Sequence, residues 1–314
     1  MAKLSKDPKL VFRVPPWASF FIPGEYADFV QLVSSDLRRR SVTAFVEEGF
    51  AILKEQATEN QKISLLNLAQ TCKAAPRSEW KTLIGNFFDS MLRIETDAEG
   101  LLEKMRDFDK VRDLIKVRLH GEGYMSHPQA SHLVLRKVAP GLAALLVCDF
   151  GFVNTSVPAS FLSEWGMSVD DLFALARKNV RAEGRLTVSE GTLLGGFSID
   201  MMSGRTNYTA SHALFFEDYL ARGTGYGAIL ALPTRDAILR HIIRDMNVIE
   251  ALRLMHMATR DFYAQGPGSI SKELYWWRAG EIKLFPAVLA GGVLQLMPTE
   301  EFQHDVLDPI MQGN

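Results

Sequence analysis

Segments with strand character and segments with helical character follow one another at short intervals through the second half of the chain. Strand signals are expected at residues 142–149, 152–157, 186–200, 226–232, 272–278 and 282–288. Helical signals are expected at residues 168–180, 209–222, 235–244 and 247–263. Because consecutive strand signals occur at both ends of this region, a mixed sheet covered by helices fits better than a regular doubly wound sheet. We therefore predict an α+β fold.

The first hundred residues predict a smaller α+β unit. Phe29, Val33 and Leu37 recur at helical spacing, and three arginines follow, which suit the C-terminus of a helix. Residues 42–53 and 62–68 have strand character, and Ser78 is the expected N-cap of a further helix. The charged segment 95–113 predicts a solvated helix that joins the two halves. We accordingly expect units at residues 1–105 and 106–314.

The N-terminal segment 10–23 combines three prolines with several large apolar residues, among them Trp17. Proline disfavours a helix here, so an extended arm is expected. The arm is interpreted first as packing on the body of the protein and second as docking a partner.

Composition excludes several classes of function. The chain has 35 Lys and Arg against 37 Asp and Glu, a formal net charge of −2, which gives no basic footprint for nucleic acid. The longest apolar stretches fall short of the roughly 20 residues that span a bilayer. Cys72 and Cys148 lack the paired spacing of a zinc site, and buried thiols suit a reducing compartment. The first residues lack the apolar run of a secretory signal, so we expect a cytoplasmic protein.

Several short motifs follow one another in the second half of the chain. They are Asp149-Phe-Gly151, Ala176-Arg-Lys-Asn179, Tyr208-Thr-Ala-Ser211, Ala231-Leu-Pro-Thr-Arg-Asp236-Ala-Ile-Leu239 and Gly266-Pro-Gly-Ser-Ile270. Their order and spacing resemble the YtpQ-like family of bacterial proteins over about residues 110–290. Where that family tends to have Gly-Tyr-Asp-Ala-Ser-Arg, this chain has Asn207-Tyr-Thr-Ala-Ser-His212. The resemblance implies a fold and no established activity.

Familiar catalytic and cofactor motifs are absent from the sequence. It contains no G-x-x-x-x-G-K-[ST] loop, no G-x-S-x-G elbow and no H-E-x-x-H, and no cofactor is predicted. His120, His127 and His132 are spaced by seven and five residues, which matches no familiar metal site. We predict an ordinary loop there and no metal, with these histidines as weak candidate ligands.

Six polar residues are expected at strand ends or helix starts. They are Asp149, Asp200, Arg205, Tyr208, Arg235 and Asp236. Such ends line one rim of a layered sheet, where carboxylates beside arginines suit a small polar ligand or general acid and base catalysis. The competing interpretation is helix capping and salt bridging, since Asp236 is expected in the first turn of a helix.

Two adjacent tryptophans, Trp276 and Trp277, are expected in a strand that ends at Arg278. Neighbours in a strand point to opposite faces, so at most one of the two enters the same core. An exposed ring would serve as an anchor for a protein partner, with Trp17 as a further contact. The alternative is a ring covered by other parts of the chain.

These observations favour a non-catalytic binding or regulatory module. The alternative is a hydrolase that acts on a small polar or phosphorylated substrate through the predicted rim, and the sequence leaves the choice between enzyme and binding protein open. An oligomer formed through the C-terminal apolar run is a third interpretation.

Overall fold

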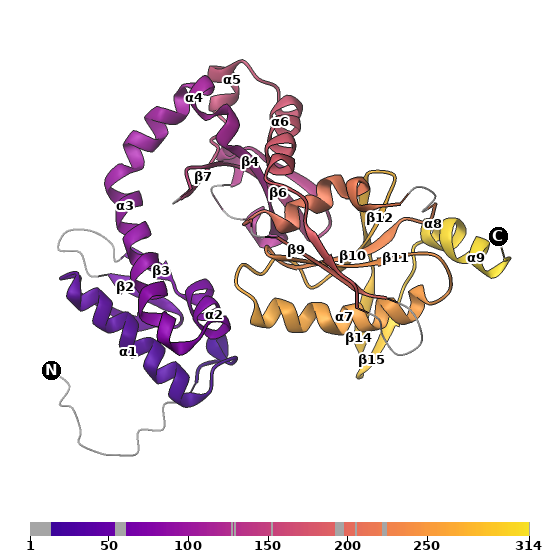
Figure 1. The fold of residues 1–314 in the computed structure, drawn as a ribbon, viewed down its shortest axis with the longest axis horizontal. Helices are drawn as coiled ribbons and strands as arrows, with labels where there is room; N and C mark the ends of the chain where they lie inside the picture. Colours follow the sequence, from indigo (N-terminus) through magenta and orange to yellow (C-terminus); the bar gives the residue numbers. More distant parts are fainter. Residues whose placement is uncertain are drawn as a thin grey trace. The chain divides into compact units, whose positions relative to one another are not determined.

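The computed structural model describes residues 14–53, 61–126, 128, 130–151, 153–191, 198–204, 206–221 and 225–313. The chain forms two compact units, Met1–Thr96 with Gln265–Pro267 and Asp97–Ala264 with Gly268–Asn314. Both contain helices and antiparallel strands, so the predicted α+β fold is confirmed (Figure 1). The predicted boundary near residue 105 lies in the helix that also contains the boundary between these units.

The first unit packs helices against a small antiparallel sheet of order β1-β2-β3. Its strands are β1 (Ala44–Glu47), β2 (Phe50–Leu53) and β3 (Gln61–Ser64). Its helices are α1 (Pro23–Arg39), α2 (Leu66–Ala74) and the first part of α3 (Trp80–Arg106), with 3₁₀ turns at Pro16–Ala18 and Arg77–Glu79. The apolar faces of α1 and α3 meet through Phe29, Val33 and Trp80, which are buried.

The N-terminal arm packs on this unit within its described residues, as the first interpretation predicted, but it is not extended throughout, because Pro16–Ala18 form a 3₁₀ turn. Ala18 and Phe21 are buried in the core, and Trp17 stacks edge-on against Tyr26 at 5.9 Å between ring centroids. Ser78 does not cap a helix, because the Glu79 N–H donates to the Pro76 carbonyl and closes a 3₁₀ turn that precedes α3. The helix α2 was not predicted.

The second unit contains a four-stranded antiparallel sheet in which β6 pairs with β4, β5 and β7. These strands are β4 (Ile115–Gly121), β5 (Leu135–Ala139), β6 (Leu142–Asp149) and β7 (Asn154–Ser156). Three helices accompany them: α4 (Phe108–Val111), α5 (Phe161–Trp165) and α6 (Val169–Ala182). Short 3₁₀ turns occur at Arg112–Leu114, Glu122–Tyr124 and Ala130–His132. Helix α6 begins at a Ser168 cap that accepts from the Asp171 N–H.

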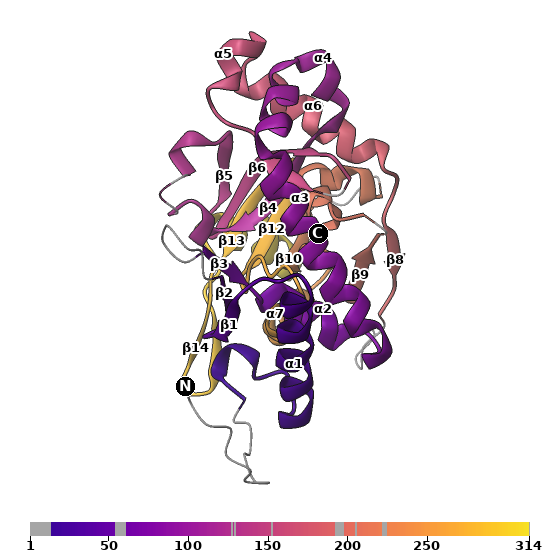
Figure 2. The same ribbon diagram turned by 90° about the vertical axis from the view of Figure 1, so that its left-hand side faces the viewer.

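A six-stranded antiparallel sheet of order β13-β12-β10-β11-β9-β8 completes the second unit (Figure 2). Its strands are β8 (Thr187–Ser189), β9 (Asp200–Ser203), β10 (Ala228–Thr234), β11 (Ala237–Ile242), β12 (Leu274–Arg278) and β13 (Glu281–Phe285). The 3₁₀ segment Thr209–Tyr219, here called η6, and helix α7 (Val248–Gln265) accompany it. The chain continues through the hairpin β14 (Ala287–Ala290) and β15 (Val293–Leu296), helix α8 (Glu300–Phe302), the π-helical turn Gln303–Leu307 and helix α9 (Asp308–Met311).

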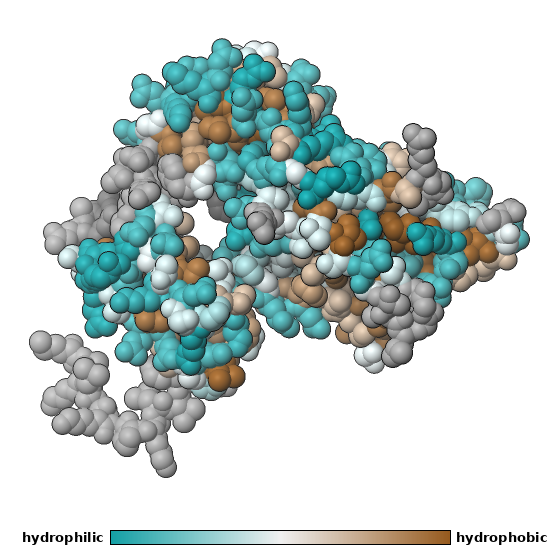
Figure 3. Space-filling view, viewed as in Figure 1, coloured by the Kyte–Doolittle hydropathy of each residue, from teal (hydrophilic) through white to brown (hydrophobic). Residues whose placement is uncertain are grey.

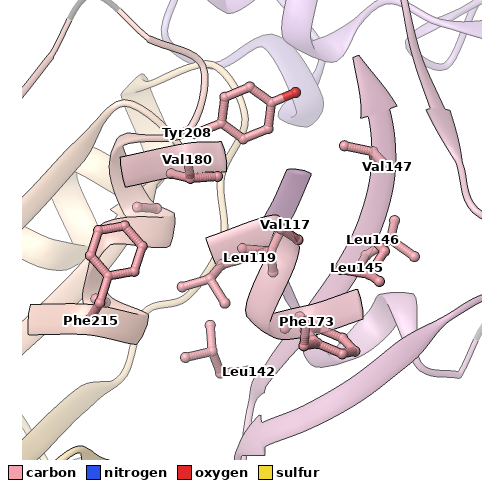
Figure 4. Close-up of a cluster of buried hydrophobic side chains, with 14 of the residues drawn as sticks. Val117, Leu119, Leu142, Leu145, Leu146, Val147, Phe173, Val180, Tyr208 and Phe215 are labelled. Carbon is pink, nitrogen blue, oxygen red and sulfur yellow. The ribbon is translucent and has the colours of Figure 1, made fainter. Parts of the chain in front are cut away.

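The main core of this unit lies between the two sheets and helix α6. Figure 4 shows Val117 and Leu119 of β4 beside Phe173 and Val180 of α6. Apolar residues recur along α6 at a spacing that turns one face of the helix toward the sheet. Its polar residues remain outside, and the surface over α5 and α6, in the upper part of Figure 3, is mainly hydrophilic.

The segment predicted as a helix at residues 235–244 is a strand instead. Residues Ala237–Ile242 form β11, which pairs with β10 on one side and β9 on the other. Arg235 and Asp236 make the hairpin turn after β10, so the apolar run that follows is buried in the middle of a sheet rather than along a helix. Asp236 consequently lies in a turn between strands and not in the first turn of a helix, as the competing interpretation expected.

Neither tryptophan of β12 is exposed, so the prediction of an exposed aromatic anchor there is wrong. Trp276 is 2% exposed and Trp277 is 5% exposed. The two rings do point to opposite faces of the strand, but both faces are covered: Trp277 packs in the main core against Phe216, and Trp276 packs with Phe302 near α7. Arg278 forms an ion pair with Asp305. The two rings therefore offer no exposed aromatic surface to a partner.

Two further features bear on the sequence predictions. No helix among the described residues is long and apolar enough to cross a membrane. Cys72 and Cys148 are free and buried, and burial raises the pKa of each thiol to about 12.

Candidate functional site

Strand β4 presents a row of basic side chains on the face opposite its core face. Ile115, Val117 and Leu119 are buried, so Lys116 and Arg118, with His120 one step further, point the other way. The strand is fixed in this orientation because the Ser211 hydroxyl of η6 donates to the Val117 carbonyl at 2.7 Å.

Asp149 lies at the end of β6 and is held by three donors. The Gly151 N–H donates to Oδ1 at 2.8 Å, the Tyr208 hydroxyl lies 2.9 Å from Oδ2, and Lys116 Nζ lies 3.4 Å from Oδ2. Burial opposes ionisation of Asp149, but these donors together hold its pKa below its usual value. Asp149 is therefore a fixed carboxylate.

Tyr208 connects this carboxylate to the core. Its ring is buried among apolar side chains, and Figure 4 shows its hydroxyl directed away from them. The hydroxyl lies 2.7 Å from Asn154 Oδ1 as well as 2.9 Å from Asp149. Burial, followed by the hydrogen bond to Asp149, raises the pKa of Tyr208, which keeps its proton at neutral pH. The residue is a donor rather than a nucleophile.

A small cavity opens beside Lys116. The ammonium lies 5.0 Å from the centre of the Tyr208 ring and forms an ion pair with Glu183, which also accepts a hydrogen bond from Thr206. Glu183 and Thr206 line a cavity of about 340 Å³ together with Arg185. Glu183 thus both pairs with Lys116 and lines the cavity.

The turn between β10 and β11 brings Arg235 and Asp236 to the same place. The Arg235 N–H donates to the Gly268 carbonyl and the Arg235 carbonyl accepts from the Ala210 N–H, both at 3.0 Å. Gly268 has φ +70°, and a Cβ there would lie 2.7 Å from Arg235 Cδ, so glycine is required for this packing. Arg235 Nε lies 3.6 Å from Asp236 Oδ1, and burial raises the pKa of Asp236 against the lowering effect of the arginines.

Arg118 is the most unusual group of this arrangement. Its side chain is half-buried, yet within the described ranges its guanidinium makes no hydrogen bond or ion pair. Burial, followed by repulsion from Arg235, lowers its pKa, although Tyr208, Asp236 and Asp149 act in the opposite direction. Arginine remains charged in proteins, so the folded chain carries a cation whose surroundings disfavour the charge.

Two more polar atoms near Arg118 lack partners within the described part of the chain. Nε2 of His120 and Nε of Arg235 are both buried without a hydrogen bond. His120 stacks on Tyr124 with ring centroids 4.5 Å apart, and burial, with the neighbouring Arg118, lowers its pKa to about 4. The imidazole is therefore neutral at pH 7. These two buried nitrogens beside Arg118 therefore have hydrogen-bonding capacity that the described side chains do not use.

The structure therefore brings together four of the six residues of the predicted rim. Asp149, Tyr208, Arg235 and Asp236 all act electrostatically on Arg118 or contact one another. We call these four residues together with Lys116, Arg118 and His120 the polar cluster. Arg205 lies outside the described residues.

Asp200 does not belong to the polar cluster. It lies on β9 and accepts a hydrogen bond at 2.9 Å from Arg240 Nε of the neighbouring strand, while another nitrogen of Arg240 donates to the Tyr219 carbonyl at 3.0 Å. Asp200 is 6% exposed, so this pair is a buried structural ion pair between strands. Asp200 was predicted at the rim because it is the last residue of the segment 186–200, which was expected to form strands that end at the rim.

Sequence reasoning missed Lys116 and Arg118, the two cations at the centre. The signal was present: residues 115–120 alternate apolar and basic side chains, the pattern of a strand with one buried face. Of the candidate metal ligands, His132 is exposed and His127 lies outside the described residues. Among the residues that the structure describes, no group of three His, Cys, Asp or Glu side chains is arranged to hold a metal ion.

Comparisons of the chain with protein-family models, with curated proteins and with solved structures found no match. A function is therefore inferred from the side chains of the polar cluster alone.

Proposed function

We propose that this protein is a non-catalytic binding module whose ligand is a small anionic molecule held at the polar cluster. The observation that carries the proposal is the half-buried Arg118, a charged group with five N–H donors and no partner within the described residues. A partially buried unpaired cation costs stability, and the cost is offset when an anion binds.

The neighbouring groups suit an oxyanion. Guanidinium binds carboxylate and phosphate through two parallel hydrogen bonds. Nε of Arg235 and Nε2 of His120 are further unsatisfied atoms near Arg118. Asp149 already accepts a hydrogen bond from Tyr208, and Asp236 lies in an ion pair 3.6 Å from Arg235 Nε, so both carboxylates have other partners and Arg118 remains available.

The test is anion-dependent stability of the full chain. Thermal unfolding is followed in increasing inorganic phosphate or succinate, with sodium chloride at matched ionic strength as the reference. We expect at least one of the two anions to raise the unfolding temperature saturably, because a ligand at 100 times its dissociation constant adds about 2.7 kcal/mol. Arg118→Met should remove the response.

The matched control is Arg112→Gln, which removes an exposed cation just before β4 in the same unit. It should respond to the anions as the wild type does. The proposal fails if neither anion gives a saturable effect, or if Arg118→Met keeps the response of the wild type.

The alternative function is a hydrolase that acts on a small polar or phosphorylated substrate. One observation favours it: burial raises the pKa of Asp236, as is common for general acids and bases. The charge of this carboxylate also interacts with that of Arg118. Hydrolysis of p-nitrophenyl phosphate and p-nitrophenyl acetate distinguishes the two functions. Turnover that Asp236→Asn abolishes would replace the binding module by the enzyme, whereas binding without turnover supports the module.

Two further expectations belong to this proposal. Membership of the YtpQ-like family is supported by the ordered motifs between Asp149 and Ile270. A cytoplasmic location is supported by the two unpaired, buried cysteines, which suit a reducing compartment.

A further inference from the structure

A second cavity of the second unit lies away from the polar cluster. Its volume is about 680 Å³, within the range of small-molecule sites in proteins. Strand β13 lies beside β5, and each pairs with one neighbouring strand of its own sheet among the described residues. Residues of both strands line the cavity, and β6, α6, η6 and the turn between β12 and β13 supply the rest of its lining. The cavity therefore occupies the place where the edges of the two sheets come together.

One part of the lining is basic. Arg136 and Lys137 come from β5, Arg177 comes from α6, and Lys283 comes from β13. Glu281 is the single carboxylate among the lining residues, all of which are described. The lining thus has a net positive charge.

Two of these cations are already neutralised. Lys283 forms ion pairs with Glu281 at 3.1 Å and with Glu301 at 2.5 Å. Arg136 pairs with Asp170 and lies over the Phe173 ring at 4.5 Å.

Lys137 and Arg177 make no ion pair within the ranges that the structure describes. Arg177 follows Phe173 by four residues on α6, so the two side chains lie on the same side of the helix and both reach the cavity. The register of β5 places the Arg136 side chain on the cavity face and the Lys137 side chain on the opposite face of the sheet, so Lys137 lines the cavity through its backbone. The uncompensated charge of the cavity is therefore carried by Arg177.

The remaining lining is apolar. Phe173 from α6, Leu214 from η6 and Ile282 from β13 contribute carbon surface to the same cavity. Phe173 is buried and the other two are half-buried, so their surface is partly accessible from the cavity. A bare inorganic ion would leave this apolar surface in contact with water.

We propose that this cavity is a second binding site, which takes a small organic anion with a carboxylate or phosphate group and an apolar body. The charged group lies against Arg177, and the apolar body lies against Phe173, Leu214 and Ile282. Guanidinium supplies charge-assisted hydrogen bonds, and burial of carbon surface adds affinity in proportion to area. The site does not depend on the polar cluster, because the two share no residue.

The experiment is calorimetric titration of the full chain with five probes: hexyl phosphate, hexanoate, inorganic phosphate, acetate and hexylammonium. We expect hexyl phosphate or hexanoate to bind, and the stronger of the two identifies the charged group. The matching ion without a hexyl chain, phosphate or acetate, should bind roughly tenfold more weakly at this site, and hexylammonium should not bind. The proposal is overturned if neither hexyl anion binds.

The variants locate the bound probe. Arg177→Gln should weaken binding of the hexyl anion by roughly tenfold or more, because a charge-assisted contact is lost. Lys178→Gln is the matched control, since it removes a cation from the adjacent, exposed position of α6, which does not line the cavity. It should leave the affinity within about twofold.

Two outcomes refute the site while leaving the proposed function open. Equal weakening by Arg177→Gln and Lys178→Gln would mean attraction to the general surface charge. Loss of hexyl-anion binding in Arg118→Met, with retention in Arg177→Gln, would place the probe at the polar cluster instead.

Discussion

Replacing Arg118 by methionine is expected to stabilise the protein in the absence of ligand. Burial and Arg235 lower the pKa of Arg118, so the folded state disfavours its charge relative to the unfolded chain. An unpaired polar group costs about 1–3 kcal/mol when it is buried, and a half-buried one less. Because methionine keeps most of the alkyl packing, we expect the free energy of unfolding to rise by about 1–2 kcal/mol. The unfolding temperature should rise by about 2–4 °C for each kcal/mol.

The assay is urea unfolding in chloride buffer at pH 7, monitored by far-ultraviolet circular dichroism and by calorimetry. Proton NMR of His120 provides an independent reading, because Arg118 is the second cause of its lowered pKa. In Arg118→Met the pKa of His120 should rise from about 4 toward its ordinary value, although burial continues to hold it down.

Arg240→Met is the matched comparison on another strand of the same unit. Arg240 pairs with the buried Asp200 and donates to the Tyr219 carbonyl, so its loss leaves a buried carboxylate without its partner. We expect this variant to lose about 3–5 kcal/mol. A loss of stability of more than about 1 kcal/mol in Arg118→Met would refute the reasoning, since it would mean that the guanidinium is well paired in the ligand-free protein.

Three further outcomes are expected. Tyr208→Phe should lower the free energy of unfolding by about 1.5–3 kcal/mol at pH 7, and by less in an Asp149→Asn background. A double-mutant cycle measures this difference, and additive losses would contradict the hydrogen bond between Tyr208 and Asp149. Trp277→Ala should cost about 3–5 kcal/mol in chemical denaturation, because the ring fills the core between the sheets, and a cost below about 1 kcal/mol would place it at the surface. Burial lowers the pKa of His212 to about 4, so as the pH falls the unfolded chain binds a proton at this residue before the folded chain does. The free energy of unfolding in urea should therefore decline from about pH 6.5 to pH 4, and a profile that stays flat over this range would contradict the burial of His212.

The sequence predicted the elements whose signals are local. Helix α1 followed from apolar residues at helical spacing, and the buried strand β6 followed from its run of apolar side chains. The prediction failed at residues 235–244, where a helical signal was assigned to the strand β11. Such a short apolar run suits either structure, and the choice was made by β9 and β10, which pair with it on both sides.

The rim was predicted in part, because strand ends and turns carry polar residues for reasons that the sequence displays. Asp149 and Tyr208 were found in this way, and their hydrogen bond confirms that they lie together. Asp200 has the same local pattern but points to a different partner, Arg240, which only the pairing of β9 with β11 brings near. Local sequence gives the position of a polar residue along its strand and does not give its neighbour across the sheet.

Charge and periodicity, which are properties of the sequence, determined that the chain has an α+β fold with a basic and apolar alternation at residues 115–120. Only the tertiary structure decided that both faces of β12 are covered, so that Trp276 and Trp277 serve two cores rather than a partner. It also decided that Arg118 of β4 lies near Arg235, which belongs to a turn far along the sequence. Arg118 consequently forms no ion pair with a carboxylate among the described residues. The physical reason is that burial and pairing depend on contacts between segments far apart in the sequence, whereas helix and strand patterns depend on near neighbours.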